Sequence, residues 1–213
     1  MLESNAVFVA RSQMNDFEPY IRRQGLAVVL SGPSGVGKDT VLDKFLPQNS
    51  SCLRLITATT RPKRDMEIDG VDYSFLSQEE FDTLRDTNQL LEHADVYGYS
   101  YGSPRKFVDE KRAEGFDVIL KLDIQGGLSV KQAMPNAVMV FLAPPSMEEL
   151  ERRLRGRRTE SPEQFAKRLG NALAEIKLIP HYDYLIVHNT PEQACEELGA
   201  IIQAERLKVA KNG

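Results

Sequence analysis

Residues 26–40 read LAVVLSGPSGVGKDT, an apolar run that leads directly into a glycine-rich loop. The apolar run is bounded by Gly25 and Gly32 and predicts a short, buried parallel strand. Residues 32–40 are close to the phosphate-binding pattern G-x-x-x-x-G-K-[ST]. Apolar residues at helical spacing follow the loop and predict a helix: Val41, Leu42, Phe45 and Leu46. A strand, a glycine loop and a helix in this order turn several backbone N–H groups toward one anion, so the stretch predicts a nucleotide site.

The loop is expected to bind the phosphates of ATP. Its glycines let the chain turn tightly and approach a phosphate without an intervening Cβ atom. Lys38 adds a compact positive charge over the β- and γ-phosphates. The residues expected to contact ATP are Gly32, Ser34, Gly35, Val36, Gly37, Lys38, Asp39 and Thr40.

One position of the loop departs from the pattern. The residue after Lys38 is Asp39, where the pattern has a Ser or Thr hydroxyl that ligates Mg²⁺. A carboxylate is also a competent Mg²⁺ ligand, although it adds negative charge near a triphosphate. Three roles therefore stay open for Asp39 at this point: binding the metal directly, holding a metal-bound water, or capping the helix.

Length and charge narrow the classes of protein that fit. The chain has 213 residues, which suits one α/β core with one or two inserted subdomains. Its formal net charge is -4, whereas nucleic-acid binders usually carry a strong basic excess, so no nucleic-acid partner is expected. Basic residues are concentrated between Arg152 and Arg168, and this local excess on an acidic chain indicates a small anionic ligand.

We expect a cytoplasmic protein with no membrane partner. No apolar stretch approaches the ~20 residues that a membrane helix needs. Residues 1–24 carry acidic side chains and lack the continuous apolar run of a secretory signal, so we expect a poorly ordered extension or a helix on the surface. Cys52 and Cys195 are in neither metal-ligand nor redox spacing and predict reduced thiols.

Strands and helices are expected to alternate along the chain. Further strands are predicted at residues 53–57, 71–75, 118–122, 137–142 and 184–187. Their alternation with helices predicts a parallel sheet in three layers, with ligands at the carboxyl ends of its strands. The segment 61–101 changes character and is expected to form a small inserted α+β subdomain.

Local signals predict where the helices begin. Ser77 and Glu80 form a capping pair for a helix from Gln78. Ser103 followed by proline predicts an N-cap and first turn, and similar steps recur at residues 146, 161 and 190. The apolar face expected for the helix after residue 161 consists of Phe165, Leu169, Leu173 and Ile176.

Several short motifs, all in one order, resemble those of the guanylate kinases. Besides the loop at Gly32, they are Thr59-Thr60-Arg61-Pro62-x-Arg64, Glu67-x-Asp69-Gly70-Val71-Asp72-Tyr73, Tyr101-Gly102-Ser103, Asp123-Ile124-Gln125-Gly126, Pro144-Pro145-Ser146 and the arginine-rich stretch from Arg153. The resemblance extends from about Leu26 to Lys208. It implies an enzyme of purine nucleotide metabolism that phosphorylates GMP, and dGMP as well, from ATP by direct in-line transfer with Mg²⁺.

The resemblance also implies an architecture. It predicts a P-loop NTPase-type core, in which helices flank a parallel sheet, with an inserted small α+β GMP-binding subdomain and a helical lid. The assembly would be a monomer or a homodimer that takes ATP and GMP as small-molecule substrates. The expected parts are an N-terminal extension at 1–24 and a domain at 25–212, divided into a core (25–60, 103–150 and 180–212), a GMP-binding subdomain (61–102) and a lid (151–179).

The phosphate of GMP is assigned four contacts by the resemblance: Arg61, Arg64, Tyr73 and Tyr101. Two guanidinium groups and two phenolic hydroxyls can saturate a dianionic monophosphate. Taken alone, the two arginines would be interpreted as a solvated turn, and only their register with the other motifs favours the phosphate site.

The guanine base is assigned its own contacts. Glu92 resembles the carboxylate that accepts the N1 and N2 hydrogens of guanine, and adenine would leave it unpaired. Alone, Glu92 would be interpreted as a surface acid; its spacing to Tyr101 and Ser103 supports the assignment, with Ser103 as donor to guanine O6. Thr57, Glu67 and Asp123 complete the expected contacts with GMP.

Catalysis is assigned to positive charge. The resemblance implies Lys38, Arg153, Arg157 and Arg168 as catalytic residues. This fits the chemistry, since phosphoryl transfer needs positioning and positive charge and no general base. Arginines carried by a lid would also exclude water from the reaction. The implied cofactor is Mg²⁺, with Asp39 and Asp123 as candidate ligands, directly or through water.

The sequence departs from the family pattern at two further places, and two rival interpretations of its function stay open. Lys121 stands where many members carry an acid, and His188-Asn189 stands where the family has an Asn-Asp pair near the adenine. Kinases of a ribose bisphosphate resemble this chain in carrying Asp after the loop lysine. A non-catalytic binding module of the same fold typically loses the loop lysine and glycines, whereas Gly37 and Lys38 are present.

Overall fold

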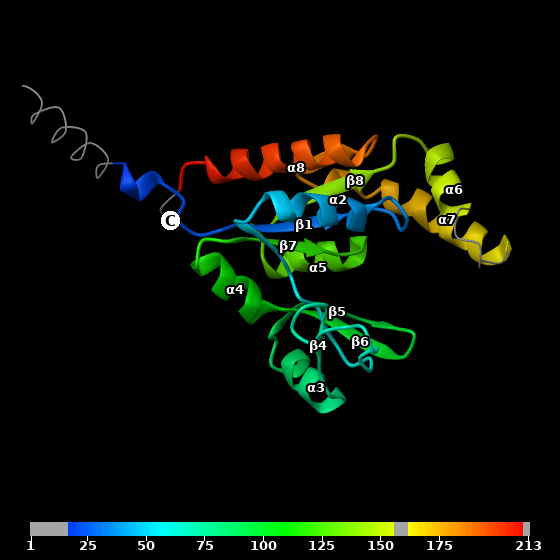
Figure 1. Ribbon diagram of the computed structural model, residues 1–213, viewed down its shortest axis with the longest axis horizontal. Coiled ribbons are helices and arrows are strands. Elements are labelled where there is room, and N and C mark those ends of the chain that lie inside the picture. Colours follow the sequence, from blue (N-terminus) through cyan, green and yellow to red (C-terminus); the bar gives the residue numbers. More distant parts are fainter. Residues whose placement is uncertain (1–16, 156–161, 211–213) are drawn as a thin grey trace, which may run out of the picture.

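The computed structural model describes residues 17–155 and 162–210, which form two β-sheets with helices around them (Figure 1). Within these residues the larger sheet has five parallel strands in the order β2-β7-β1-β8-β9. The strands are β1 (Ala27–Ser31), β2 (Cys52–Arg54), β7 (Asp117–Lys121), β8 (Val138–Ala143) and β9 (Tyr184–Val187). A parallel sheet at the centre of the molecule confirms the predicted α/β class.

Helices cover both faces of this sheet, as Figure 1 shows, with α2 and α8 on one face and α4 and α5 on the other. β1 is buried along its whole length, and its successive side chains point alternately to the two faces of the sheet. Val28 and Leu30 join the core under α2 and α8, whereas Val29 joins the core over α4 and α5. The helices and short 3-10 turns are η1 (Glu18–Tyr20), α2 (Lys38–Phe45), η2 (Leu46–Gln48), α3 (Gln78–Asp86), α4 (Arg105–Ala113), α5 (Ile124–Ala133), α6 (Met147–Arg155), α7 (Pro162–Ile176), η3 (Ile179–His181) and α8 (Pro191–Arg206).

The smaller sheet is mixed and lies to one side of the core, together with α3 (Figure 1). Its order is β4-β3-β6-β5, in which β3 pairs parallel with β4 and antiparallel with β6. The strands are β3 (Ala58–Thr59), β4 (Ser74–Phe75), β5 (Leu90–Val96) and β6 (Tyr99–Pro104). A small mixed-sheet subdomain is therefore present, as predicted, although most of its strands lie outside the predicted ranges.

The second predicted strand was too long. It was expected at 53–57, but β2 ends at Arg54, because the chain then crosses from the large sheet to the small one, where β3 begins at Ala58. The strand expected at 71–75 shrinks to Ser74–Phe75, since Val71 and Asp72 instead donate backbone hydrogen bonds to Ile68 in a turn.

The hairpin of β5 and β6 was missed by the sequence analysis. Tyr97 and Gly98 join the strands, both with positive φ (51° and 83°), which suits the twist of a two-residue hairpin turn. The helix start predicted with Ser103 as N-cap was wrong by one residue. Ser103 lies inside β6, and α4 begins at Arg105 with Pro104 as its N-cap.

Other helix starts follow their predicted signals. Ser77 and Glu80 form a complete capping box, and Thr190 accepts the Gln193 N–H at the start of α8. The start of α6 also agrees, since the Glu149 N–H donates to Ser146 Oγ. In α7 the predicted face was partly wrong: Leu173 is half exposed, whereas Ala172 is buried in the core with α6.

The structure describes the N-terminal segment from residue 17 onward. Residues 1–16 lie outside the described residues, and residues 17–24 include the turn η1. Cys52 and Cys195 are free thiols, as predicted. Among the helices of 17–155 and 162–210, none has the length and apolarity that a membrane crossing requires.

Candidate active site

The glycine-rich loop lies between β1 and α2, as the sequence predicts, and its glycines are sterically required. Gly32, Gly35 and Gly37 have φ values of +147°, +84° and +107°, a region that side chains rarely adopt. A Cβ atom at Gly32 would lie 2.1 Å from the Leu142 carbonyl oxygen, and one at Gly37 would lie 2.6 Å from His188 Cε1. The loop can therefore pack against β8 and His188 only with glycine at these positions.

Lys38 is the first residue of α2, and its ammonium group points back over the loop. Its Nζ donates to the carbonyl oxygens of Gly32 and, at 3.3 Å, of Pro33. Burial lowers the pKa of Lys38 to about 8, while the carboxylates of Glu175, Asp123 and Asp39 favour its charged form. An ammonium group held among backbone carbonyls without a full counter-charge is suited to receive a phosphate.

Two of the three arginines expected at the donor phosphates reach this loop. Arg153 in α6 donates to the carbonyl oxygens of Val36 at 2.9 Å and His188 at 3.2 Å. Arg168 in α7 donates to Ser34 Oγ at 3.0 Å. The third, Arg157, lies outside the described residues. The helices α6 and α7 thus bring guanidinium groups to the loop from a distant part of the sequence.

His188, one of the departures noted above, also supports the loop. It is buried beneath Gly37, and its Nδ1 lies 2.7 Å from the Val36 carbonyl oxygen and 3.3 Å from Arg153 Nη1. Val36 is thereby held by both His188 and Arg153. This role was not visible in the sequence, because 152 positions separate the two hydrogen-bonded residues.

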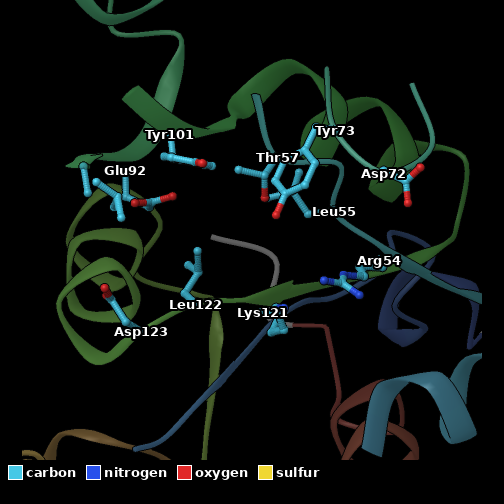
Figure 2. Close-up of a pocket in the computed structure, with 12 residues that line it drawn as sticks. Arg54, Leu55, Thr57, Asp72, Tyr73, Glu92, Tyr101, Lys121, Leu122 and Asp123 are labelled. Atoms are coloured by element: carbon cyan, nitrogen blue, oxygen red, sulfur yellow. The ribbon is translucent and has the colours of Figure 1, made fainter. Parts of the chain in front are cut away.

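A pocket opens between the two sheets, at the carboxyl ends of β2 and β7, and we call it the inter-sheet pocket (Figure 2). This is the location at which parallel sheets bind ligands. Thr57, Tyr73, Glu92 and Tyr101 line it from the side of the small sheet, and Arg54, Lys121 and Asp123 line it from the large sheet. Five of the nine residues expected to bind GMP therefore share one pocket.

Glu92 and Ser103 face each other in the hairpin of β5 and β6. Ser103 Oγ donates a 2.6 Å hydrogen bond to Glu92 Oε1. Burial raises the pKa of Glu92, the bond from Ser103 opposes this shift, and the nearby Asp123 carboxylate adds to it. A mostly buried carboxylate of this kind is suited to accept two N–H groups from a ligand.

Arg61 and Glu67 form a bidentate ion pair at the edge of the pocket. The Nη1 and Nη2 atoms of Arg61 lie 3.1 Å and 2.7 Å from the two carboxylate oxygens of Glu67, which also accepts the Arg64 backbone N–H at 2.8 Å. The Arg61 guanidinium lies 5.3 Å from the centre of the Tyr73 ring. Glu67 therefore holds the side chain of Arg61 and the backbone of Arg64, while its predicted contact with GMP stays a prediction.

The position of Asp39 excludes one of the three roles that the sequence left open for it. Its carboxylate lies 2.5 Å from Lys121 Nζ and 3.4 Å from Arg54 Nη2, while Gly37 is the N-cap of α2. Capping the helix is therefore not its role. Partial burial favours a higher pKa for Asp39, but the hydrogen bond and charge of Lys121, with Arg54, hold the pKa below its usual value.

The carboxylates near the loop fit a magnesium ion that arrives with a nucleotide. Mg²⁺ in kinases is held by one or two carboxylates and by substrate phosphates. In the part of the chain that the structure describes, no cluster of three or more His, Cys, Asp or Glu could hold a metal alone. Asp39 is largely exposed, and Asp123, which caps α5 through Gly126 at 2.8 Å, stands at the end of β7 beside Lys38.

Arg54 was missed as a site residue. It lines the inter-sheet pocket and contacts Asp39, but it lies in a short strand without any phosphate motif. Its position as the last residue of a parallel strand was the available signal, since such ends face the ligand. Lys121 had been noted only as a departure, and it occupies the corresponding end of β7.

Comparison with known proteins agrees with the motifs. The family model described as guanylate kinase matches residues 24–205. The chain is 42% identical over 192 residues to a guanylate kinase of Caldanaerobacter subterraneus subsp. tengcongensis, covering 90% of this chain and 93% of that protein. It is 45% identical over 190 residues to a guanylate kinase of Symbiobacterium thermophilum, covering 89% and 90%. The crystal structure of guanylate kinase from Anaplasma phagocytophilum is similar with a TM-score of 0.68 at 35% identity, covering 88% and 89% of the two chains.

Proposed function

The chain belongs to the guanylate kinase family, and from this membership we propose that it transfers the terminal phosphoryl group of ATP to GMP, forming ADP and GDP. The observation that carries the proposal is the Glu92 carboxylate, held by Ser103 in a pocket that is also lined by Lys121 and Asp123, whose charges act on Lys38. A guanine-specific acceptor and a donor-phosphate loop then lie on the two sides of one cleft. dGMP is accepted as well, because none of the proposed contacts uses the 2′-hydroxyl.

GMP binds in the inter-sheet pocket. Glu92 accepts the N1 and N2 hydrogens of guanine, and Ser103 then turns its hydroxyl toward O6. Adenine offers an acceptor at N1 and no amino group at C2, so it leaves the buried carboxylate unpaired. Thr57 and Asp123 provide further polar contacts from the pocket wall.

The monophosphate of GMP lies against the cationic edge of the pocket. Arg61, Arg64, Tyr73 and Tyr101 supply its charge-assisted hydrogen bonds. Glu67 contributes indirectly, because its bidentate pair fixes the guanidinium of Arg61 before the substrate arrives. Rigid positioning of this kind reduces the entropy lost on binding.

ATP binds with its phosphates on the loop of residues 32–40, beside Lys38. Arg153, Arg157 and Arg168 bring positive charge to the transferring phosphoryl group, and the acceptor oxygen of GMP approaches in line. Mg²⁺ would be held at Asp39 and Asp123 and would neutralise charge on the donor phosphates. No general base is needed, because the GMP phosphate is already an anionic nucleophile.

The proposed reaction assigns a separate role to each of three parts of the chain. We assign the segment 61–102 to GMP binding, 151–179 to a lid that closes over ATP, and the remaining parts of 25–212 to the core. Closure would exclude water and so limit the hydrolysis of ATP. The protein would work in the cytoplasm as a monomer or a homodimer.

The proposal is tested by ADP formation from Mg·ATP with GMP, dGMP, AMP, UMP and a ribose bisphosphate offered separately. We expect rapid turnover with GMP and dGMP and little with the others. Turnover with the ribose bisphosphate alone would reassign the substrate, in keeping with the Asp that follows Lys38. No turnover with any acceptor would point to a binding module instead.

A further inference from the structure

Two residues that depart from the family pattern contact each other. Asp39 stands where the loop pattern has a hydroxyl, and Lys121 stands where many guanylate kinases carry an acid. Their side chains form a 2.5 Å ion pair although 82 positions separate them in the sequence. Relative to the family pattern, position 39 has thus gained a negative charge, and position 121 carries a positive charge in place of a negative one. The two new charges pair with each other.

The location of Lys121 places its ammonium group between the two substrate sites. It is the last residue of β7, paired in register with Leu30 of β1, directly before the loop. It is close enough to Lys38 to lower the pKa of that amine. It also lines the inter-sheet pocket opposite Tyr73 and Tyr101, as Figure 2 shows.

Arg54 extends the same cationic wall. Its guanidinium stands beside Lys121 in Figure 2, and both residues line a groove that continues from the inter-sheet pocket to Asp39, Glu67 and Tyr73. Both cations contact the carboxylate of Asp39. The other carboxylates that line the groove are engaged elsewhere, since Glu67 pairs with Arg61 and Asp72 accepts the Ile68 N–H at 2.7 Å. The side chains of Arg54 and Lys121 are 40% and 27% exposed, so both can reach a ligand in the groove.

We propose that Lys121, positioned by Asp39 and assisted by Arg54, is a further phosphate-binding residue that contacts the monophosphate of GMP from the core side. This inference rests on the proposed function. The small sheet would hold the phosphate through Arg61, Arg64, Tyr73 and Tyr101, and Lys121 would hold it from the opposite wall. An acid at position 121 would repel the same phosphate, whereas the ammonium group of Lys121 attracts it.

The test measures binding of GMP and of guanosine by titration calorimetry, without ATP or Mg²⁺, for the wild type and Lys121→Met. A lost charge-assisted contact should weaken GMP binding about tenfold or more and leave guanosine binding within twofold. Lys121→Arg should retain most of the GMP affinity, because it keeps the charge. Lys131→Met is the matched control, since Lys131 also forms an ion pair, 3.1 Å from Asp183, with a side chain exposed to a similar degree, 33%.

The outcomes separate this inference from the proposed function. If the wild type binds GMP and Lys121→Met binds it equally well, the inference is overturned and the proposed function stands. Equal losses for GMP and guanosine would also overturn it, because they would assign Lys121 a structural role in the base pocket. If the wild type itself fails to bind GMP, the proposed function fails, and the inference fails with it.

Discussion

Ser103 Oγ donates a 2.6 Å hydrogen bond to Glu92 Oε1 across the hairpin of β5 and β6. The two residues occupy neighbouring cross-strand positions, since His93 pairs with Gly102 in the register of the hairpin. The carboxylate is mostly buried, near the carboxylate of Asp123, and its pKa is raised by that burial. A mostly buried acceptor is therefore in place before any base enters the pocket.

Glu92→Gln should reduce the preference for GMP over AMP by about 100-fold or more, because the amide can no longer accept both N1–H and N2–H. The measurement is kcat/KM for the two acceptors. Glu110→Gln, a change on the exposed side of α4, is the control and should leave the ratio unchanged. An unaltered ratio in Glu92→Gln would remove this residue from the base site.

The same substitution should stabilise the ligand-free protein near neutral pH. Because the pKa of Glu92 is raised on folding, the folded state binds the proton more tightly, and the charged form lowers stability above that pKa. Glu92→Gln should therefore have a higher Tm than the wild type at pH 7.5. The difference should vanish below the unfolded-state pKa of a glutamate, about 4.3. A Tm advantage that does not depend on pH would contradict this account.

The parts of the site that could be predicted from the sequence are those set by local signals. The loop at Gly32, the start of α3 at Ser77 and the start of α8 at Thr190 each depend on a few adjacent residues, and the structure has them as predicted. The hairpin of β5 and β6 was missed because residues from His93 to Val96 are all exposed, so this part of β5 has no buried face that would reveal a half-buried strand.

Pairings between distant segments could not be predicted in the same way. Nothing near Asp39 indicates that Lys121 lies beside it, or that His188 lies under Gly37. The one available signal was that Asp39 and Lys121 depart from a family pattern with opposite charges. These two departures can be recognised as a contact only when the strand order is known, because it places β7 next to β1.

Gly37→Ala should weaken ATP binding by more than tenfold. The added Cβ would lie 2.6 Å from Cε1 and 2.9 Å from Nδ1 of His188, and the backbone φ of +107° would be strained. Gly98→Ala is a matched control, because it has a similar positive φ, +83°, and open space around its Cβ. Both variants should fold, and calorimetric titration with ATP should separate them. Equal ATP affinities would show that the contact with His188 does not constrain the loop.

Glu67→Gln should raise the KM for GMP about tenfold while kcat changes by less than about threefold. The amide loses the charge that holds both nitrogens of Arg61, so the guanidinium is less ordered when the phosphate arrives. Glu114→Gln is the control, since Glu114 accepts two hydrogen bonds from Lys111 at an exposed site, at 2.9 Å and 2.7 Å. Loss of kcat with an unchanged KM would contradict a positioning role for Glu67.

Lys38→Met should abolish turnover, by about a thousandfold or more, and leave the fold intact. Burial lowers the pKa of Lys38 to about 8, below the value of about 10.4 for an unfolded lysine. Between these values the unfolded chain binds the proton more tightly, so the charged amine costs stability below pH 8 and this cost disappears as the pH rises through that window. Lys38→Met should therefore have a Tm at pH 7 at least equal to that of the wild type, with the difference shrinking toward pH 10. Inactivity with this Tm pattern would assign the loss to phosphate binding, whereas normal turnover by Lys38→Met would contradict the proposed mechanism.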